Sequence, residues 1–99
     1  MEDPGFSRAY ILLGNCFFHL NELNKAVVFI QKGLDMDHTD ALGYFFLGET
    51  YEKMFDNTCN VKNIESAIKS YENAINLDPT YENAKTDLKR AKEKRSKVN

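Results

Sequence analysis

Few residues in this 99-residue chain have the type and spacing that chemistry requires. Cys16 and His19 are three residues apart, so a helix would place these two metal-ligating side chains on adjacent turns. The sequence has no second closely spaced pair of ligands, so a four-ligand zinc site would also need His38 and Cys59, which both lie in predicted connections between helices. Because free cysteines are often buried, we interpret Cys16 as a packed side chain and His19 as a groove-lining one, and we expect no metal ion.

Glu49 and Glu52 form another closely spaced pair, and two carboxylates can serve general acid–base catalysis. The chain has no glycine-rich phosphate loop and no nucleophile elbow to accompany them. We therefore interpret the two glutamates as the polar edge of a groove. The protein is predicted not to be an enzyme and to need no cofactor.

The composition predicts a single helical domain. Apolar residues make up 42% of the chain and charged residues 28%, with five Gly, two Pro and no Trp. This balance is typical of a folded helical protein. The sequence shows no charged-then-apolar leader and no apolar stretch long enough to span a membrane, so a cytoplasmic, reducing location is expected.

Charge is unevenly distributed along the chain. Residues 1–84 contain six Lys and Arg against thirteen Asp and Glu, whereas residues 85–99 contain seven against two. The basic residues of this C-terminal segment are Lys85, Lys89, Arg90, Lys92, Lys94, Arg95 and Lys97. Binding of a nucleic acid or an anionic surface by these residues is the alternative function. A solvated helix face is preferred, because the cations are distributed around the predicted helix and no aromatic residue lies between them to stack on bases.

The elements that would position these residues form an internal repeat. Residues 10–17 have the pattern Tyr-x-x-Leu-Gly-x-x-Phe, and residues 44–51 repeat it with Tyr in the last place. A second pair of similar stretches begins at Ala26 and, 41 residues later, at Ala67. Glycine in the middle of a helix costs about 1 kcal/mol relative to alanine, so the two repeated glycines indicate close helix packing. A repeat of this length predicts stacked helical units.

Apolar residues at helical spacing predict five helices. The predicted segments are 8–20, a segment through 26–36, a segment from about 40 to 55, 64–77 and 81–97. Ser7, Thr39 and Thr80 are predicted to cap the first, third and fifth of these helices. Residues 1–6 are expected to be a flexible lead-in, and the seven residues inserted into the second unit are expected to form a long loop near 56–63.

The repeated pattern resembles the tetratricopeptide repeat, whose unit is about 34 residues long. The resemblance rests on the Tyr-x-x-Leu-Gly-x-x-Phe/Tyr block, on the small residues Ala26 and Ala67, and on Asp78-Pro79. It implies an all-α fold in which antiparallel helix hairpins stack as a right-handed α-solenoid. Two units would occupy residues 7–40 and 41–81, and residues 82–99 would form a C-terminal solvating helix that caps the array.

The resemblance also implies a non-catalytic protein-interaction module with a concave groove for an apolar or amphipathic peptide or helix. The chain would be either a free-standing module or the C-terminal part of a larger scaffold or co-chaperone protein. The residues expected to line the groove are Arg8, Ile11, Leu12, Asn15, Phe18, His19, Leu42, Phe45, Phe46 and Glu49. Phe45 and Phe46 are the expected aromatic anchors for the partner, and self-association through the same apolar surface stays open.

A subgroup of the family holds the C-terminal carboxylates of heat-shock chaperones with Lys, Arg and Asn side chains. The matching positions in this chain are Ile11, Asn15, Phe46, Asn83 and Asp87, and only Asn15 is of the required type. The missing donors remove the charge-assisted hydrogen bonds that this recognition needs. The chain is therefore predicted not to bind chaperone tails by a carboxylate clamp.

Overall fold

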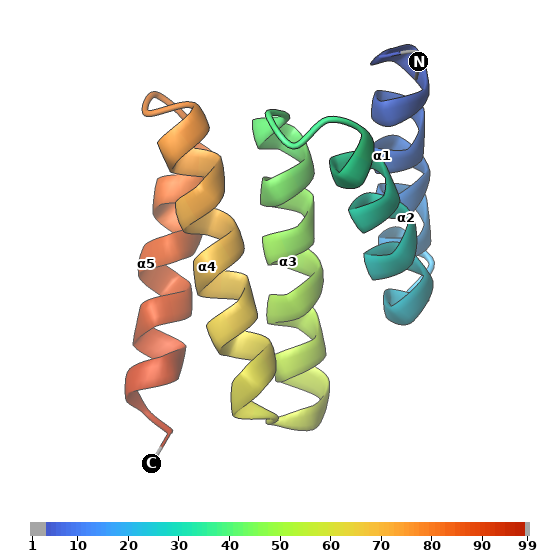
Figure 1. The fold of residues 1–99 in the computed structure, drawn as a ribbon. Helices are drawn as coiled ribbons and strands as arrows, with labels where there is room; N and C mark the ends of the chain where they lie inside the picture. Colours follow the sequence, from blue (N-terminus) through green and yellow to red (C-terminus); the bar gives the residue numbers. More distant parts are fainter. Residues whose placement is uncertain (1–3, 99) are drawn as a thin grey trace.

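The computed structural model describes residues 4–98, which form five α-helices and no β-strand. The helices are α1 (Pro4–His19), α2 (Leu23–Met36), α3 (Ala41–Thr58), α4 (Val61–Leu77) and α5 (Glu82–Ser96). They lie side by side in chain order, with α1 at one end of the row and α5 at the other (Figure 1). The helices α1 and α2 form one antiparallel hairpin, α3 and α4 form a second, and α5 packs on α4. The architecture is an all-α solenoid, as the repeat predicts.

The two repeated glycines lie where paired helices cross closely. A Cβ atom at Gly14 would collide with Ile30 of α2, and one at Gly48 would lie 2.6 Å from the Tyr71 ring of α4. Both glycines are therefore required by packing, which offsets the intrinsic cost of glycine inside a helix. This close approach buries Ile30 and Tyr71 completely.

The core consists of two apolar clusters joined by α3. The first contains Ile11, Ile30 and Leu34 of the first hairpin together with Leu47 of α3. The second is built around Ile64 and Tyr71 and continues through the small alanines of α5. Tyr44, Phe46 and Tyr51 of α3 touch both clusters, so α3 holds the two hairpins in register. Leu13, the leucine of the first repeated pattern, lies outside this core, because 41% of the residue is exposed.

The start of the first helix differs from the prediction. Residues 4–6 belong to α1, so this part of the expected flexible lead-in is helical; residues 1–3 lie outside the described part of the chain. Proline suits the first turn of a helix because its missing N–H has no partner there in any case. Ser7 is not an N-cap: its side chain is buried, and its Oγ donates a 3.0 Å hydrogen bond to the carbonyl oxygen of Gly33.

The two predicted threonine caps are also displaced. The N-cap of α3 is Asp40, whose Oδ1 accepts a 3.1 Å hydrogen bond from the backbone N–H of Leu42. Thr39 instead donates its hydroxyl and its backbone N–H to Asp37, and Thr80 donates to Asp78 in the same way. Both threonines therefore stabilise the turn that precedes a helix rather than the helix end itself.

The predicted loop near residues 56–63 is wrong, because the inserted residues extend two helices. The helix α3 continues to Thr58, α4 starts at Val61, and only Cys59 and Asn60 connect them. Cys59 adopts the left-handed conformation with φ of 59°, which ends α3, and Asn60 Oδ1 caps α4 by accepting from the N–H of Lys62 at 3.0 Å. The second hairpin therefore reaches further than the first.

Candidate protein-binding groove

One face of α3 borders two pockets that follow each other along the helix. Leu42, Glu49 and Asp56 are seven residues apart and so lie on this one face. The pocket near the C-terminal end of α3 has a volume of about 360 Å³ and is lined by Phe18, Glu49, Glu52, Lys53, Asp56, Asn57, Arg90 and Lys94. The pocket at the N-terminal end has a volume of about 380 Å³ and is lined by Arg8, Asp37, Thr39, Asp40, Ala41, Leu42, Asp78 and Tyr81. We call these two pockets together the α3 groove; helices α1, α3 and α5 all contribute to its walls.

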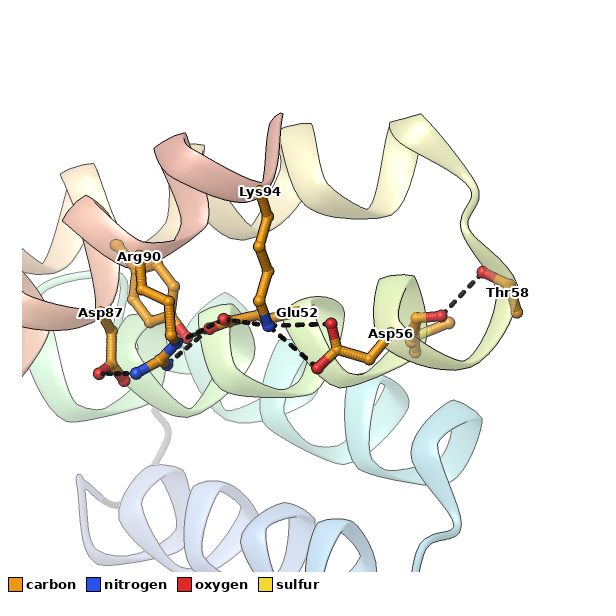
Figure 2. Close-up of polar contacts among 8 residues, drawn as sticks. Glu52, Asp56, Thr58, Asp87, Arg90 and Lys94 are labelled. Atoms are coloured by element: carbon orange, nitrogen blue, oxygen red, sulfur yellow. Dashed lines mark hydrogen bonds and ion pairs between the residues drawn. The ribbon is translucent and has the colours of Figure 1, made fainter. Parts of the chain in front are cut away.

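Glu52 is the centre of a polar network on the floor of the groove (Figure 2). Its side chain is buried, with only 4% of the residue exposed. Arg90 of α5 donates from Nε and from its second terminal nitrogen to the two carboxylate oxygens, at 2.7 and 2.8 Å. The hydroxyl of Tyr71 donates to the same carboxylate at 2.7 Å. Lys94 lies 2.8 Å from Glu52 and also donates to Asp56 at 2.9 Å.

The network fixes the protonation states of its members. Burial alone would raise the pKa of Glu52, but the hydrogen bonds from Arg90, Lys94 and Tyr71 outweigh it and lower the pKa to about 2. Burial and the bond to Glu52 raise the pKa of Tyr71 above its usual value, so its hydroxyl stays a donor. Charge-assisted bonds of this length are strong and directional. The contacts between α3 and α5 are therefore structural, and Glu52 has no free oxygen to offer a ligand.

Glu49 is the acid of the first pocket that lacks such partners among the described residues. It is half-buried one turn before Glu52, and it forms no salt bridge or hydrogen bond within residues 4–98. Burial and the negative charge of Asp87 raise the pKa of Glu49 to about 7, and the charge of Arg90 offsets this only in part. A carboxylate in this state gains from an approaching cation, because the cation would lower its pKa and restore the charged form.

Side chains of α1 complete the groove at both ends. Arg8 donates from Nε and from a terminal nitrogen to the two oxygens of Asp40, at 2.8 and 3.1 Å. At the other end, the ammonium of Lys53 lies 5.4 Å from the ring centre of Phe18, a cation–π contact between α3 and α1. The Phe18 ring also meets His19 edge-on at 5.2 Å. These contacts hold Phe18 at the wall of the first pocket.

The structure separates the ten expected groove residues into groups. Phe18 and Glu49 share the first pocket, and Arg8 and Leu42 share the second. Leu12, Asn15 and His19 of α1 line neither pocket. Phe46 is half-buried and packs between the two core clusters, next to the Phe45 ring at 6.1 Å.

Two of the expected groove residues are core residues instead. Ile11 is completely buried beneath α3, where it would meet any Cβ added at Gly43. Phe45 is 8% exposed and packs between the rings of Tyr71 and Tyr81, at centroid distances of 6.0 and 5.0 Å. Its expected role as an aromatic anchor is therefore wrong, because α5 and its preceding turn already cover it. The sequence alone could not show this, since Phe45 and the covering residue Tyr81 are 36 residues apart and meet only in the folded chain.

The basic residues of α5 are largely neutralised by the protein itself. Arg90 and Lys94 are bonded to Glu52 and Asp56, Arg95 lies 3.1 Å from Glu65, and Lys85 lies 3.7 Å from Glu82. The remaining basic residues, which have no such partner in the described chain, are Lys89, Lys92 and Lys97. A patch of this size offers few phosphate contacts, so nothing in the structure favours the nucleic-acid alternative.

The sequence interpretation missed the cationic wall of the groove, although a signal was present. Glu52 and Asp56 are four residues apart on α3, and Arg90 and Lys94 have the same spacing on α5. Such matched spacings place two acids opposite two cations when the helices pack in register. The bonded pairs are both separated by 38 residues. A search for opposite charges at a constant offset would have found them.

The other chemistry-bearing residues do not gather into a metal site in the part of the chain that the structure describes. Cys16 and Cys59 are both free thiols and both exposed, so the interpretation of Cys16 as a packed side chain is wrong. Within residues 4–98, no group of three or more His, Cys, Asp or Glu side chains is arranged to hold a metal ion. None of the described helices combines the length and apolar character needed to cross a membrane.

Comparison with protein families matches two stretches of the chain to the same repeat. The model of the tetratricopeptide repeat matches residues 7–40 and residues 60–81, which together make up more than half of the sequence. A comparison with curated proteins gave no match. Tetratricopeptide repeats generally mediate protein–protein interaction and are typically non-catalytic.

Proposed function

This chain belongs to the tetratricopeptide repeat family, and from that premise we propose that its α3 groove binds an amphipathic segment of another protein that carries a basic residue. The proposal is supported above all by one observation, the pairing of an aromatic wall with an unsatisfied acid. Phe18 and Glu49 line the same pocket, and Glu49 is the one acid there without a salt bridge among the described residues.

The charges around the pocket argue for a cation on the partner. The acids Glu52 and Asp56 are already paired with Arg90 and Lys94, which leaves Glu49 to meet the ligand. A partner Lys or Arg would form an ion pair with Glu49 in a half-buried setting, where such pairs are worth more than on an open surface. The aliphatic stem of that residue would pack on Phe18.

The second pocket supports the same kind of partner. It contains three acids, Asp37, Asp40 and Asp78, against the single cation Arg8, which is bonded to Asp40. Leu42 and Tyr81 add apolar surface there. An extended or helical segment that follows α3 from one pocket to the other would therefore meet alternating apolar and acidic contacts.

The same residues argue against acidic partners. Two of the positions that would have to supply donors for a carboxylate clamp are Ile11, which is buried, and Asp87, which is an acid bonded to Arg90. An acidic chaperone tail would also be repelled by Glu49. The proposed partner is thus basic and amphipathic rather than a terminal carboxylate.

The test uses two synthetic helices of identical length that carry the same leucine stripe, one flanked by Lys and one by Glu. Each is labelled with a fluorophore and titrated with the protein while anisotropy is recorded. We expect the Lys-flanked helix to bind and Glu49→Lys to weaken that binding by about tenfold, because an ion pair becomes a repulsion. The control Glu72→Lys makes the same charge change at an exposed site on α4 and should leave the affinity unchanged.

Two outcomes would contradict the proposal in different ways. Equal binding of the Lys-flanked and Glu-flanked helices would show that the groove does not select a basic partner, although it would still bind an apolar segment. Equal weakening by Glu49→Lys and Glu72→Lys would show that the helix binds through the overall negative charge of the body and not in the groove.

A further inference from the structure

An apolar stripe runs along the side of α1 that faces away from the rest of the protein. Its members are Phe6, Ala9, Leu13, Cys16 and Leu20, and all five are exposed. Their spacing of three and four residues keeps them on one face of the helix. Leu20 follows α1 directly and still bonds through its N–H to the carbonyl of Cys16 at 3.1 Å, so it continues the stripe. No charged residue interrupts this α1 stripe.

The second repeat shows what the same positions do when they are covered. Thirty-four residues after Ala9, Leu13 and Cys16 stand Gly43, Leu47 and Thr50 of α3, which are all buried. Leu47 belongs to the core cluster that contains Ile30 and Leu34 of α2. On α1, which lies at the end of the row, no helix of the described chain covers the equivalent face (Figure 1). The exposed fraction is 41% for Leu13 and 66% for Leu20.

The order of side-chain sizes makes this stripe complementary to itself. Along the helix a small residue, Ala9, is followed by the large Leu13, the small Cys16 and the large Leu20. When two such helices are placed antiparallel with Leu13 opposite Cys16 of the other copy, Ala9 comes to lie opposite Leu20 of that copy. Leu13 and Leu20 of each copy then meet a small side chain of the other copy, which favours close helix packing.

We propose that the α1 stripe is a docking surface for a second copy of this chain, packed antiparallel about a two-fold axis between Leu13 and Cys16. A two-fold interface uses the same patch on both partners, and an uncharged, size-alternating stripe meets that requirement without like-charge repulsion. One helix against one helix buries a small area for a stable complex, so the dimer forms reversibly and at micromolar or higher concentration. None of the five residues of the α1 stripe lines the α3 groove.

The register is tested by disulfide trapping. The native thiols are first removed as Cys16→Ser and Cys59→Ser, and Ala9→Cys or Leu20→Cys is added to separate samples. In the proposed register the thiol that replaces Ala9 in one copy lies opposite the thiol that replaces Leu20 in the other. An equimolar mixture of the two variants should therefore oxidise to a covalent dimer. Each variant alone should stay largely monomeric, because its two identical positions are offset by about 16 Å along the helix pair, beyond the reach of a disulfide.

The surface is tested separately by light scattering over a concentration series. Leu13→Glu should abolish the concentration-dependent dimer, since it places two carboxylates near the two-fold axis. The matched control is Leu77→Glu on α4, because Leu77 is 42% exposed and lies outside the stripe. Circular dichroism confirms that both variants are folded. A wild-type chain that stays monomeric at every concentration, a Leu77→Glu chain that dissociates as fully as Leu13→Glu, or efficient cross-linking of either single-cysteine sample would each overturn the proposal.

Discussion

The Glu52 carboxylate and the Arg90 guanidinium, 38 residues apart, form two hydrogen bonds of 2.7 and 2.8 Å that join α3 to α5. Because Tyr71 of α4 donates to the same carboxylate, one acid links three helices. The link is made on the floor of the α3 groove, so the closing helix takes part in shaping the binding surface. The helix α5 is thus both a solvated end and a wall of the site.

The Glu52 network should contribute more to stability than the surface ion pairs. Its lowered pKa means that the ionised form is favoured in the folded state. We expect Glu52→Gln to lower the free energy of unfolding by about 1–3 kcal/mol, since Arg90 and Lys94 lose the negative charge and one of the two acceptor oxygens is replaced by a donor. The control Glu65→Gln removes the more exposed partner of Arg95 and should cost less than about 1 kcal/mol. Urea denaturation measures both, and equal losses would contradict a special role for Glu52.

Glu49 should make the protein less stable as pH rises through the range from 4.5 to 7. The pKa of its carboxyl is about 7 in the folded state and near the ordinary 4.5 in the unfolded chain, so the folded state binds the proton more tightly. The stability penalty is therefore absent below pH 4.5 and complete above pH 7. We expect Glu49→Gln to raise the melting temperature at pH 8 and to leave it unchanged near pH 4.5.

The matched control for this pH dependence is Glu72→Gln, which removes an exposed carboxylate of α4. Thermal unfolding of the wild type and both variants at pH 4.5, 6 and 8 separates the effect of Glu49 ionisation on stability from a pH-independent effect of packing. If Glu49→Gln stabilised the protein equally at all three pH values, the gain would come from packing and not from the ionisation of Glu49.

The short α3–α4 connection makes Asn60 a stability determinant. Its Oδ1 accepts from the N–H of Lys62 at the start of α4. Asn60→Ala should therefore lower the free energy of unfolding by about 1 kcal/mol, the usual value for a lost N-cap. Asn57→Ala, at an exposed position without a capping bond, should lower it much less. A long flexible loop at residues 56–63 would make the two substitutions equally harmless.

The fold could be predicted from the sequence because its signals are local and repeated. The patterns at residues 10–17 and 44–51 place Gly14 and Gly48 at the helix crossings, where the structure needs them. The inserted segment was misjudged because its asparagines favour turns, while Phe55 and Val61 still pack on the second core cluster and keep both helices intact. Packing overrides a weak local preference in this case.

The site was harder to predict because it depends on contacts between distant helices. Phe45 has the helical position of a groove residue, yet Tyr81 from the turn before α5 covers it. Arg90 and Lys94 look like parts of a basic tail until α5 is placed beside α3, where they meet Glu52 and Asp56. Only the three-dimensional arrangement shows that Glu49 is the acid of its pocket left without a partner among residues 4–98.

The α3 groove as a protein-binding surface is tested most directly by mapping a bound ligand. Backbone amide chemical shifts of the ¹⁵N-labelled chain are followed during titration with the Lys-flanked helix. We predict that the largest changes cluster at Phe18, Glu49, Lys53, Asn57 and Arg90, which border one pocket. Changes confined to the α1 stripe, or to Lys89 and Lys92 on the outer face of α5, would contradict the proposed groove.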